Sequence, residues 1–227
     1  MPYTIMHRPR ITRRLHLELD ENGGLVVVAP VHWSKRLITE TLAHNMNRVE
    51  KFLAVSNNRH SKPLQYRAGE KHLYLGRAYR LVTHAARQNR VAVDDGTIHV
   101  WVTTPVPGKT RTVLQNWYRH EAGVVFQARL EEVSRRVPWT DTRRVLLQQR
   151  RMKRTWGNCS AGGLIKLNTH LVKAPVEIID SVIAHELCHL EEMNHTAAFY
   201  NLLEQLNPNW KRNRACLRSK GAVYLRT

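Results

Sequence analysis

Residues 183–195, IAHELCHLEEMNH, contain the side chains of this 227-residue chain that are best suited to do chemistry. His185, Glu186 and His189 form an HExxH motif. Residues four apart lie on one face of a helix, so the two imidazoles can converge on one metal ion while the glutamate reaches a water on that metal. This is the chemistry of a zinc hydrolase with Glu186 as its general base.

The position of Glu186 around the helix argues against a chance arrangement. At about 100° per residue, Glu186 falls inside an apolar arc that is formed by Ile179, Val182, Ile183, Leu187 and Leu190. An unpaired carboxylate in such a place costs several kcal/mol, so a zinc ion with its bound water is the expected partner. Cys188 points away from this direction, and we expect it to be a packed thiol.

A hydrolytic zinc site takes three ligands from the protein and leaves one position for water. His195 is the nearest candidate for the third ligand. Asn194 can end the helix in a left-handed conformation and Thr196 can begin the next helix, which turns the chain back toward the metal. Three glutamates are alternative candidates for this ligand, namely Glu191, Glu192 and Glu204. Glu204 is the strongest of them.

Several stretches together resemble the bacterial YgjP-like metallopeptidases, relatives of the SprT and WLM zincins. They are HELCHLEEMNH, the following FYNLLEQLNPNW, and the upstream RTWGNCS and GGLIKLN, with a weaker likeness at NWYRHEA and VVVAP. The resemblance implies a zincin-like, minimal gluzincin-type metallopeptidase domain with zinc on His185, His189 and His195 and with Glu186 as the general base. Asn158 stands where that family usually has serine.

The expected reaction is hydrolysis of peptide bonds in a protein or peptide substrate, by a zinc metalloendopeptidase. Zinc on three neutral imidazoles lowers the pKa of a bound water to about 7. Glu186 then takes the proton and later delivers it to the leaving amine. Trp156 and Asn158 are candidates for lining the cleft, since zincins commonly lay substrate along an exposed strand. The candidates for a second hydrogen-bond donor to the oxyanion are Asn158, Asn194 and Tyr200.

Hydrophobic periodicity and turn residues predict the elements that hold these side chains. Helices are expected from the N-cap Ser34 through residue 55, over 110–136, over 175–193, and from Thr196 to before Pro208. Strands are expected in a hairpin over 11–31, over 73–84 and 90–103 with a turn at Asp95-Gly96, and on both sides of a turn at 161–163. The predicted class is α+β, with an N-terminal β-rich module of one helix at 1–109 and the metallopeptidase domain at 110–227.

The chain is strongly basic, with 36 Lys and Arg against 18 Asp and Glu and a net charge of +18. Such an excess favours polyanionic partners through long-range attraction and counterion release, although a solvated basic surface is the plainer interpretation. The alternative function is therefore a nucleic-acid-associated protein with a structural or degenerate metal site. A protease that acts on DNA-bound proteins, as relatives of the SprT type do, combines both functions. Basic groups occur at 143–154 and 211–220 without a DNA-reading motif.

Cysteine usage and hydropathy bear on the compartment. The three cysteines are widely spaced and form no CxxC pair, which fits reduced thiols and makes a zinc ribbon improbable. The N-terminus has no signal-like apolar segment, and no apolar run is long enough to cross a bilayer. We expect a cytoplasmic protein without a membrane partner.

Overall fold

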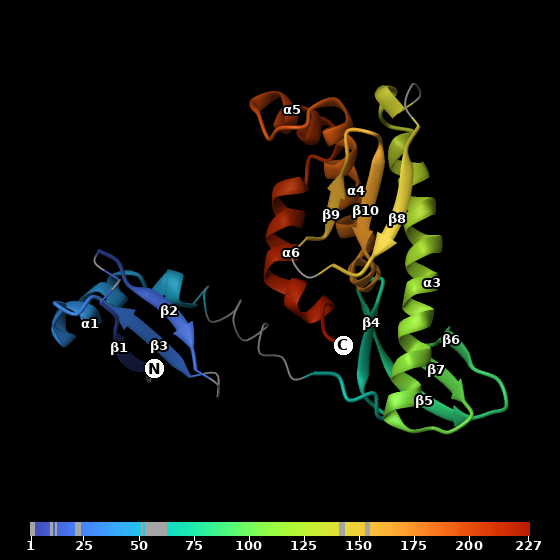
Figure 1. Ribbon diagram of the computed structural model, residues 1–227, viewed down its shortest axis with the longest axis horizontal. Helices are drawn as coiled ribbons and strands as arrows, with labels where there is room; N and C mark the ends of the chain where they lie inside the picture. The colour runs from blue at the N-terminus through green and yellow to red at the C-terminus, as the bar shows by residue number, and fades with distance from the viewer. Residues whose placement is uncertain are drawn as a thin grey trace. The chain divides into compact units, whose positions relative to one another are not determined.

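The computed structural model describes residues 3–9, 11, 13–20, 24–50, 52, 63–140, 144–152 and 155–227. The chain divides into two compact units, Met1–Lys62 with Arg218–Val223, and Pro63–Leu217 with Tyr224–Thr227. Both units contain strands and helices, which confirms the α+β class (Figure 1). The division lies at residue 62 rather than at the expected 109, because the strands between these positions share the hydrophobic core of the second unit.

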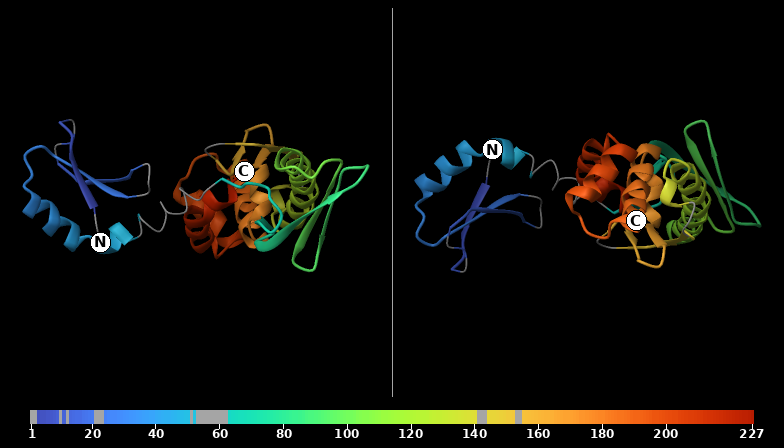
Figure 2. Two further views of the ribbon diagram at one scale, coloured as in Figure 1. Left: turned by 90° about the horizontal axis from the view of Figure 1, so that it is seen from below. Right: turned by 90° about the horizontal axis from the view of Figure 1, so that it is seen from above.

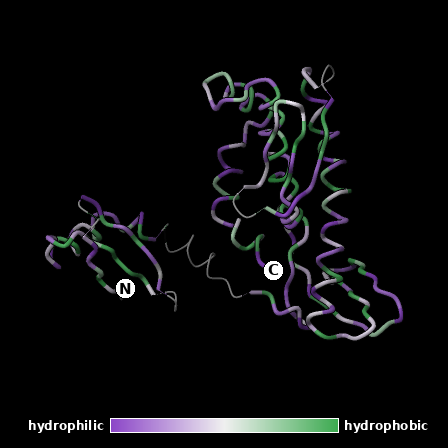
Figure 3. The backbone as a smooth tube through the Cα atoms, in the orientation of Figure 1, coloured by the Kyte–Doolittle hydropathy of each residue, from purple (hydrophilic) through white to green (hydrophobic). Residues whose placement is uncertain are grey.

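The first unit is built on a small three-stranded sheet and one helix. The strands are β1 (Tyr3–His7), β2 (His16–Leu19) and β3 (Leu25–Ala29), and the helix is α1 (Lys35–His44). β3 is central, antiparallel to β2 and parallel to β1, and all five of its residues are buried, in line with its hydrophobic colour in Figure 3. Ser34 caps α1 as predicted, since its hydroxyl accepts the Leu37 N–H at 3.3 Å. Residues 21–23 of the expected turn, and all but Phe52 of the expected helix beyond Glu50, lie outside the described residues.

The second unit begins with a four-stranded sheet in the order β4-β5-β7-β6. Its strands are β4 (Lys71–Tyr74), β5 (Arg77–Ala85), β6 (Arg90–Asp94) and β7 (Thr97–Val102). The predicted turn at Asp95-Gly96 joins β6 to β7, and both turn residues have positive φ, 29° and 74°. Leu81, Ile98 and Val100 are fully buried in the core of this unit.

A second sheet, in the order β8-β10-β9, lies beside the helix that carries the HExxH motif (Figure 1). Its strands are β8 (Leu146–Arg150), β9 (Gly157–Cys159) and β10 (Leu164–Asn168). β10 pairs in parallel with β8 and antiparallel with β9. Among the described strands β9 pairs with β10 alone, so β9 is an edge strand, and it contacts the helix α4 (Val176–Glu191).

The remaining helices are α3 (Pro107–Ser134), α5 (Ala197–Leu206) and α6 (Trp210–Tyr224), with 3-10 turns η1 (Pro138–Thr140) and η2 (Thr169–Lys173). Both views of Figure 2 show α4, α5 and α6 gathered on one side of the second unit, with α3 and the four-stranded sheet on the other. Helix α6 was not predicted, because its many charged residues obscure the apolar periodicity. Within the described part of the chain, no helix is long and apolar enough to cross a membrane.

Helix α3 supports α4 along much of its length. Its buried residues recur every three or four positions, which gives the alternating colours along α3 in Figure 3. Arg129 of α3 donates two hydrogen bonds to the Asp180 carboxylate of α4, at 2.7 and 2.8 Å. Beyond α3, the Trp139 indole N–H donates to the backbone oxygen of Leu187 at 3.1 Å. The helix that carries the HExxH motif is therefore held at Asp180, toward its start, and at Leu187, toward its end.

Candidate metal centre

Three histidines, two from α4 and one from the segment after it, converge. Ligand nitrogens of His185, His189 and His195 all lie within 4.8 Å of one another. The Nε2 atoms of His185 and His195 are 3.1 Å apart. Two imidazole nitrogens on one tetrahedral zinc ion, at 2.0–2.1 Å from it, are about 3.3 Å apart. This spacing, in an all-imidazole donor set, fits a divalent metal such as zinc.

A side chain of helix α5 packs against all three histidines. The ring of the fully buried Phe199 lies 4.9 Å from that of His185, 4.6 Å from His189 and 4.7 Å from His195, between centroids. Thr196 caps α5 as predicted, because its hydroxyl accepts the Phe199 N–H at 3.4 Å. The N-cap at Thr196 therefore places the Phe199 ring about one helical turn after His195. The contact of Phe199 with all three imidazoles was not predicted from the sequence.

The chain returns to the cluster by a different route from the one predicted. Asn194 is not left-handed. Instead α4 ends at Glu191, and the backbone of the C-cap residue Glu192 is extended (φ −132°, ψ 103°). The Glu192 carboxylate accepts the Asn194 N–H at 3.1 Å, and its backbone oxygen lies 3.2 Å from Nδ1 of His189. A hydrogen bond at Nδ1 leaves Nε2 of His189 free to bind a metal.

The alternative glutamate ligands lie outside the cluster. The Glu204 carboxylate accepts a hydrogen bond from the Trp210 indole and pairs with Lys211 at 3.4 Å. Glu191 is exposed, and Glu192 is used in the return of the chain. Among the described residues, the metal-competent group at this position consists of the three histidines. Cys188 is fully buried outside that group, as the helical geometry indicated.

The environment of His185 and His195 favours the neutral form of both imidazoles. Burial, together with smaller contributions from His189, His195 and Arg214, lowers the pKa of His185 to about 4. Burial also lowers the pKa of His195, again with help from His189 and Arg214. Neutral imidazole is the form that binds metal ions, so the lowered pKa values of His185 and His195 favour metal binding at neutral pH.

Glu186 is buried beside this cluster, with 5 % of its surface exposed. Among the described residues none donates a hydrogen bond to its carboxylate, and burial raises its pKa to about 8. The buried acid predicted from the helical pattern is thus present. A carboxylate in this position needs a cation or a water as its partner.

Gly157 of β9 makes room for the Glu186 side chain. A Cβ atom at position 157 would lie 2.5 Å from Oε1 of Glu186 and 2.9 Å from Cδ and Cγ. The carboxylate therefore lies directly against the edge strand. Sequence reasoning did not single out Gly157, although a glycine inside a strand is a known signal of close approach.

A cavity of about 410 Å³ is lined by His185, Glu186 and His195, and we call it the histidine cleft. Trp156 lines it as expected, while α6 contributes lining residues that were not foreseen, Trp210, Arg214 and Leu217. Arg214 is exposed and forms no ion pair within the described chain. A cation and apolar side chains thus border the predicted metal site together.

Asn158 is outside this lining, which corrects its expected place in the cleft. Successive side chains of a strand point to opposite faces, and Gly157 already faces Glu186. The Asn158 amide instead lies 3.8 Å from the sulfur of Met152. Asn194 and Tyr200, the other residues considered as oxyanion donors, are also outside the lining.

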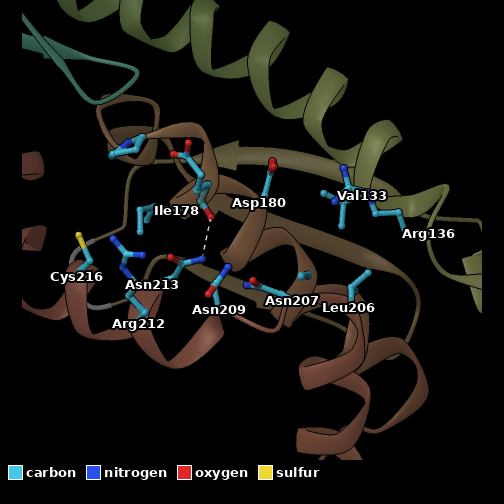
Figure 4. A pocket seen from close by; sticks show the side chains of 13 residues that line it. Val133, Arg136, Ile178, Asp180, Leu206, Asn207, Asn209, Arg212, Asn213 and Cys216 are labelled. Carbon is cyan, nitrogen blue, oxygen red and sulfur yellow. Dashed lines mark hydrogen bonds between the residues drawn. The ribbon is translucent and has the colours of Figure 1, made fainter.

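A larger cavity, of about 470 Å³, borders a different side of α4 (Figure 4). It shares Ile178 and Asn213 with the histidine cleft but contains none of the three histidines. Its lining includes three asparagine side chains that lie near one another in Figure 4, Asn207, Asn209 and Asn213. Of these two cavities, the smaller one contains the groups able to perform hydrolysis.

These features define an α+β protein whose HExxH helix and a third histidine form a metal-competent centre. The family model of the YgjP-like metallopeptidase domain matches residues 13–220, and the chain belongs to this metallopeptidase family. No match was found among curated proteins. The crystal structure of the metallopeptidase zymogen of Pyrococcus abyssi abylysin is similar at 19% identity and a TM-score of 0.30, covering 44% of this chain and 87% of that chain.

Proposed function

We propose that this protein is a zinc-dependent endopeptidase, with zinc on His185, His189 and His195 and with Glu186 as the general base. The observation that carries the proposal is the convergence of three imidazoles beside a buried carboxylate that receives no hydrogen bond from the described residues. Three nitrogen ligands with one remaining position are typical of hydrolytic zinc sites. The membership in a metallopeptidase family agrees with this chemistry.

Each side chain of the cleft has a distinct role in the proposed reaction. A bound zinc ion supplies Lewis-acid activation of water and of the scissile carbonyl. Glu186 accepts the proton of the attacking water and returns it to the leaving amine. Arg214, a cation in the same cavity without a carboxylate partner in the described chain, stabilises the oxyanion as its charge develops.

The proposed substrate is an extended protein or peptide segment. Such a segment can add as a further strand to the free edge of β9, in the mode of β-augmentation. Apolar side chains wall the cavity next to Glu186, among them Val182, Leu203 and Leu217. A bulky apolar side chain beside the scissile bond is therefore the expected preference.

The proposal is tested by metal analysis and peptide cleavage on matched variants. Wild type should bind about one zinc per chain and cleave an internal bond of a peptide blocked at both ends. Glu186→Gln should keep the zinc and lose activity by about 10²–10⁴-fold, because it removes the proton acceptor without removing a ligand.

The third ligand is tested by comparing three further variants. His195→Ala should release zinc, whereas Glu204→Ala and His120→Ala, which changes an exposed histidine on α3, should retain it. Release by Glu204→Ala with retention by His195→Ala would contradict the ligand assignment. Full activity of Glu186→Gln would contradict the general base, and cleavage only from free peptide ends would contradict the endopeptidase assignment.

A further inference from the structure

A further cavity of the second unit is lined by several basic side chains and, among the described residues, by no acidic side chain. Its volume is about 270 Å³, and it shares no lining residue with the histidine cleft. Its walls come from α3, from the end of β8, and from η2. Among the described residues of this lining none is acidic, and five are basic, namely Arg119, Arg150, Arg151, His170 and Lys173. We call this the arginine pocket.

Within the described chain, no acidic side chain forms an ion pair with the guanidinium groups of the arginine pocket. Arg119 and Arg150 are exposed and form no ion pair with any described residue. Arg151 donates a hydrogen bond to the Thr227 hydroxyl at 3.1 Å, which is a neutral acceptor. Three guanidinium groups are thus available to an external anion.

Lys173 places a fourth cation at the base of the pocket. It is 4 % exposed, and its ammonium group donates to the backbone oxygen of Arg226 at 2.7 Å and lies 5.1 Å from the Tyr118 ring. Fully buried lysines are normally paired with a carboxylate. None of the described contacts of Lys173 provides one.

The electrostatic environment agrees with this geometry. Burial, together with smaller contributions from the neighbouring Arg151 and Arg226, lowers the pKa of Lys173 to about 7. Burial also lowers the pKa of His170 to about 3, with contributions from Lys173 and Arg151. The basic groups therefore repel one another, and an anion in the pocket would relieve that repulsion.

We propose that the arginine pocket binds the phosphate group of a small phosphorylated ligand. Guanidinium groups recognise phosphate through pairs of parallel hydrogen bonds, and a lysine ammonium adds a point charge. Several cations around one cavity suit a phosphate dianion better than a single carboxylate. The volume lies just below the range of about 300–1,000 Å³ that is usual for small-molecule sites, which favours a compact ligand over a polymer.

The pocket also has groups that can contact the rest of such a ligand. Tyr66 and Tyr118 supply aromatic surface, and Gln115 and Gln149 supply amide donors and acceptors. A nucleoside monophosphate has both the phosphate and a body that could use these groups. Inorganic phosphate offers only the phosphate group.

Isothermal titration calorimetry on the full chain at low ionic strength tests the proposal, with inorganic phosphate, adenosine 5′-monophosphate, adenosine and succinate as probes. We expect phosphate and the nucleotide to bind at about one per chain, and adenosine and succinate to bind much more weakly. The double variant Arg150→Gln, Arg151→Gln should lower the affinity for phosphate by about tenfold or more. The matched control is Arg77→Gln, Arg80→Gln, which removes the same charge from exposed positions of β5.

The outcomes separate the ligand sources and can refute the site. Equal affinity for phosphate and nucleotide identifies the phosphate group as the whole ligand, whereas tighter nucleotide binding identifies a nucleotide site. If both double variants lost the same affinity for phosphate, binding would depend only on the overall charge of the protein, and the proposal would be overturned. It would also be overturned if succinate bound as tightly as phosphate, or if only a single-stranded oligonucleotide bound. Circular dichroism melts verify that both double variants are folded.

Discussion

The proposed chemistry depends on where single side chains lie relative to Glu186. Its carboxylate is buried, has a pKa raised to about 8 by burial, and lies against Gly157 of the edge strand. On the other side it faces a cavity that also contains Arg214. A general base must stay within hydrogen-bond reach of the reacting water, so small displacements of this side chain should affect activity strongly.

Gly157→Ala should move the Glu186 carboxylate and lower activity without releasing zinc. The added methyl group would come within 2.5 Å of Oε1, and the flexible end of the glutamate can yield while the fold persists. We expect kcat/KM to fall by about tenfold or more. The matched control is Gly162→Ala in the following turn, where the nearest atom to the new Cβ is 4.0 Å away. Equal activities of the two variants would refute the role of Gly157.

Arg214→Gln should reduce the rate of the chemical step. If Arg214 stabilises the oxyanion, its loss should lower kcat by about 10²-fold or more, in the range found for single oxyanion donors. Arg212→Gln is the control, because this neighbouring exposed arginine lies outside the histidine cleft. Zinc content should be unchanged in both variants. A change in KM alone would assign Arg214 to substrate binding instead.

At the level of elements, the site depends on how β10 and η2 lead into α4. Asn168, at the end of β10, is almost fully buried, and its amide donates to the backbone oxygens of Met152 at 2.8 Å and Thr155 at 3.0 Å. Its side-chain oxygen accepts the His170 N–H at 3.2 Å. One amide thus links the start of η2 to the segment that leads into Trp156 and Gly157.

Asn168→Ala should destabilise this unit and weaken catalysis. The change leaves buried backbone groups without partners, at a cost of about 2 kcal/mol in the free energy of unfolding. Thermal melting should show the loss of stability, and kcat/KM should fall at temperatures where the variant is still folded. Asn116→Ala, at an exposed position of α3, should change neither quantity. A variant at position 168 with normal stability would show that these hydrogen bonds contribute little.

For the molecule as a whole, charge is the dominant property beyond the metal centre. The net charge of +18 is spread over many exposed Lys and Arg side chains, and one part of it gathers in the arginine pocket. The buried Lys173 connects this charge to stability, because its folded pKa of about 7 lies below the value of about 10.4 expected in an unfolded chain. Between these values the unfolded state binds more protons, so the contribution of Lys173 to stability rises with pH over this window.

Lys173→Met should therefore alter the pH dependence of unfolding. Below about pH 7 wild type carries the full cost of a buried ammonium group, which methionine avoids, and that cost declines as the pH rises toward 10. The melting temperature of the variant relative to wild type should be higher at about pH 6 than at about pH 9. A difference that is constant across this range would show that Lys173 does not titrate between folded and unfolded states.

Local features could be predicted from the amino-acid sequence: the HExxH pair on one helical face, the buried glutamate between them, the Ser34 and Thr196 caps and the Asp95-Gly96 turn. These features depend on residues within a few positions of one another, so periodicity and turn chemistry suffice. The family resemblance, carried by contiguous stretches, was likewise confirmed.

Contacts between residues far apart in the chain became known from the three-dimensional structure. It brings Gly157 of an edge strand against Glu186, Phe199 beneath the three histidines, and Arg214 of α6 into the cleft, while it excludes Asn158 and Glu204. It also collects the arginine pocket from α3, β8 and η2. Such contacts depend on packing between elements far apart in the chain, and hydrophobic periodicity carries no information about which faces will meet.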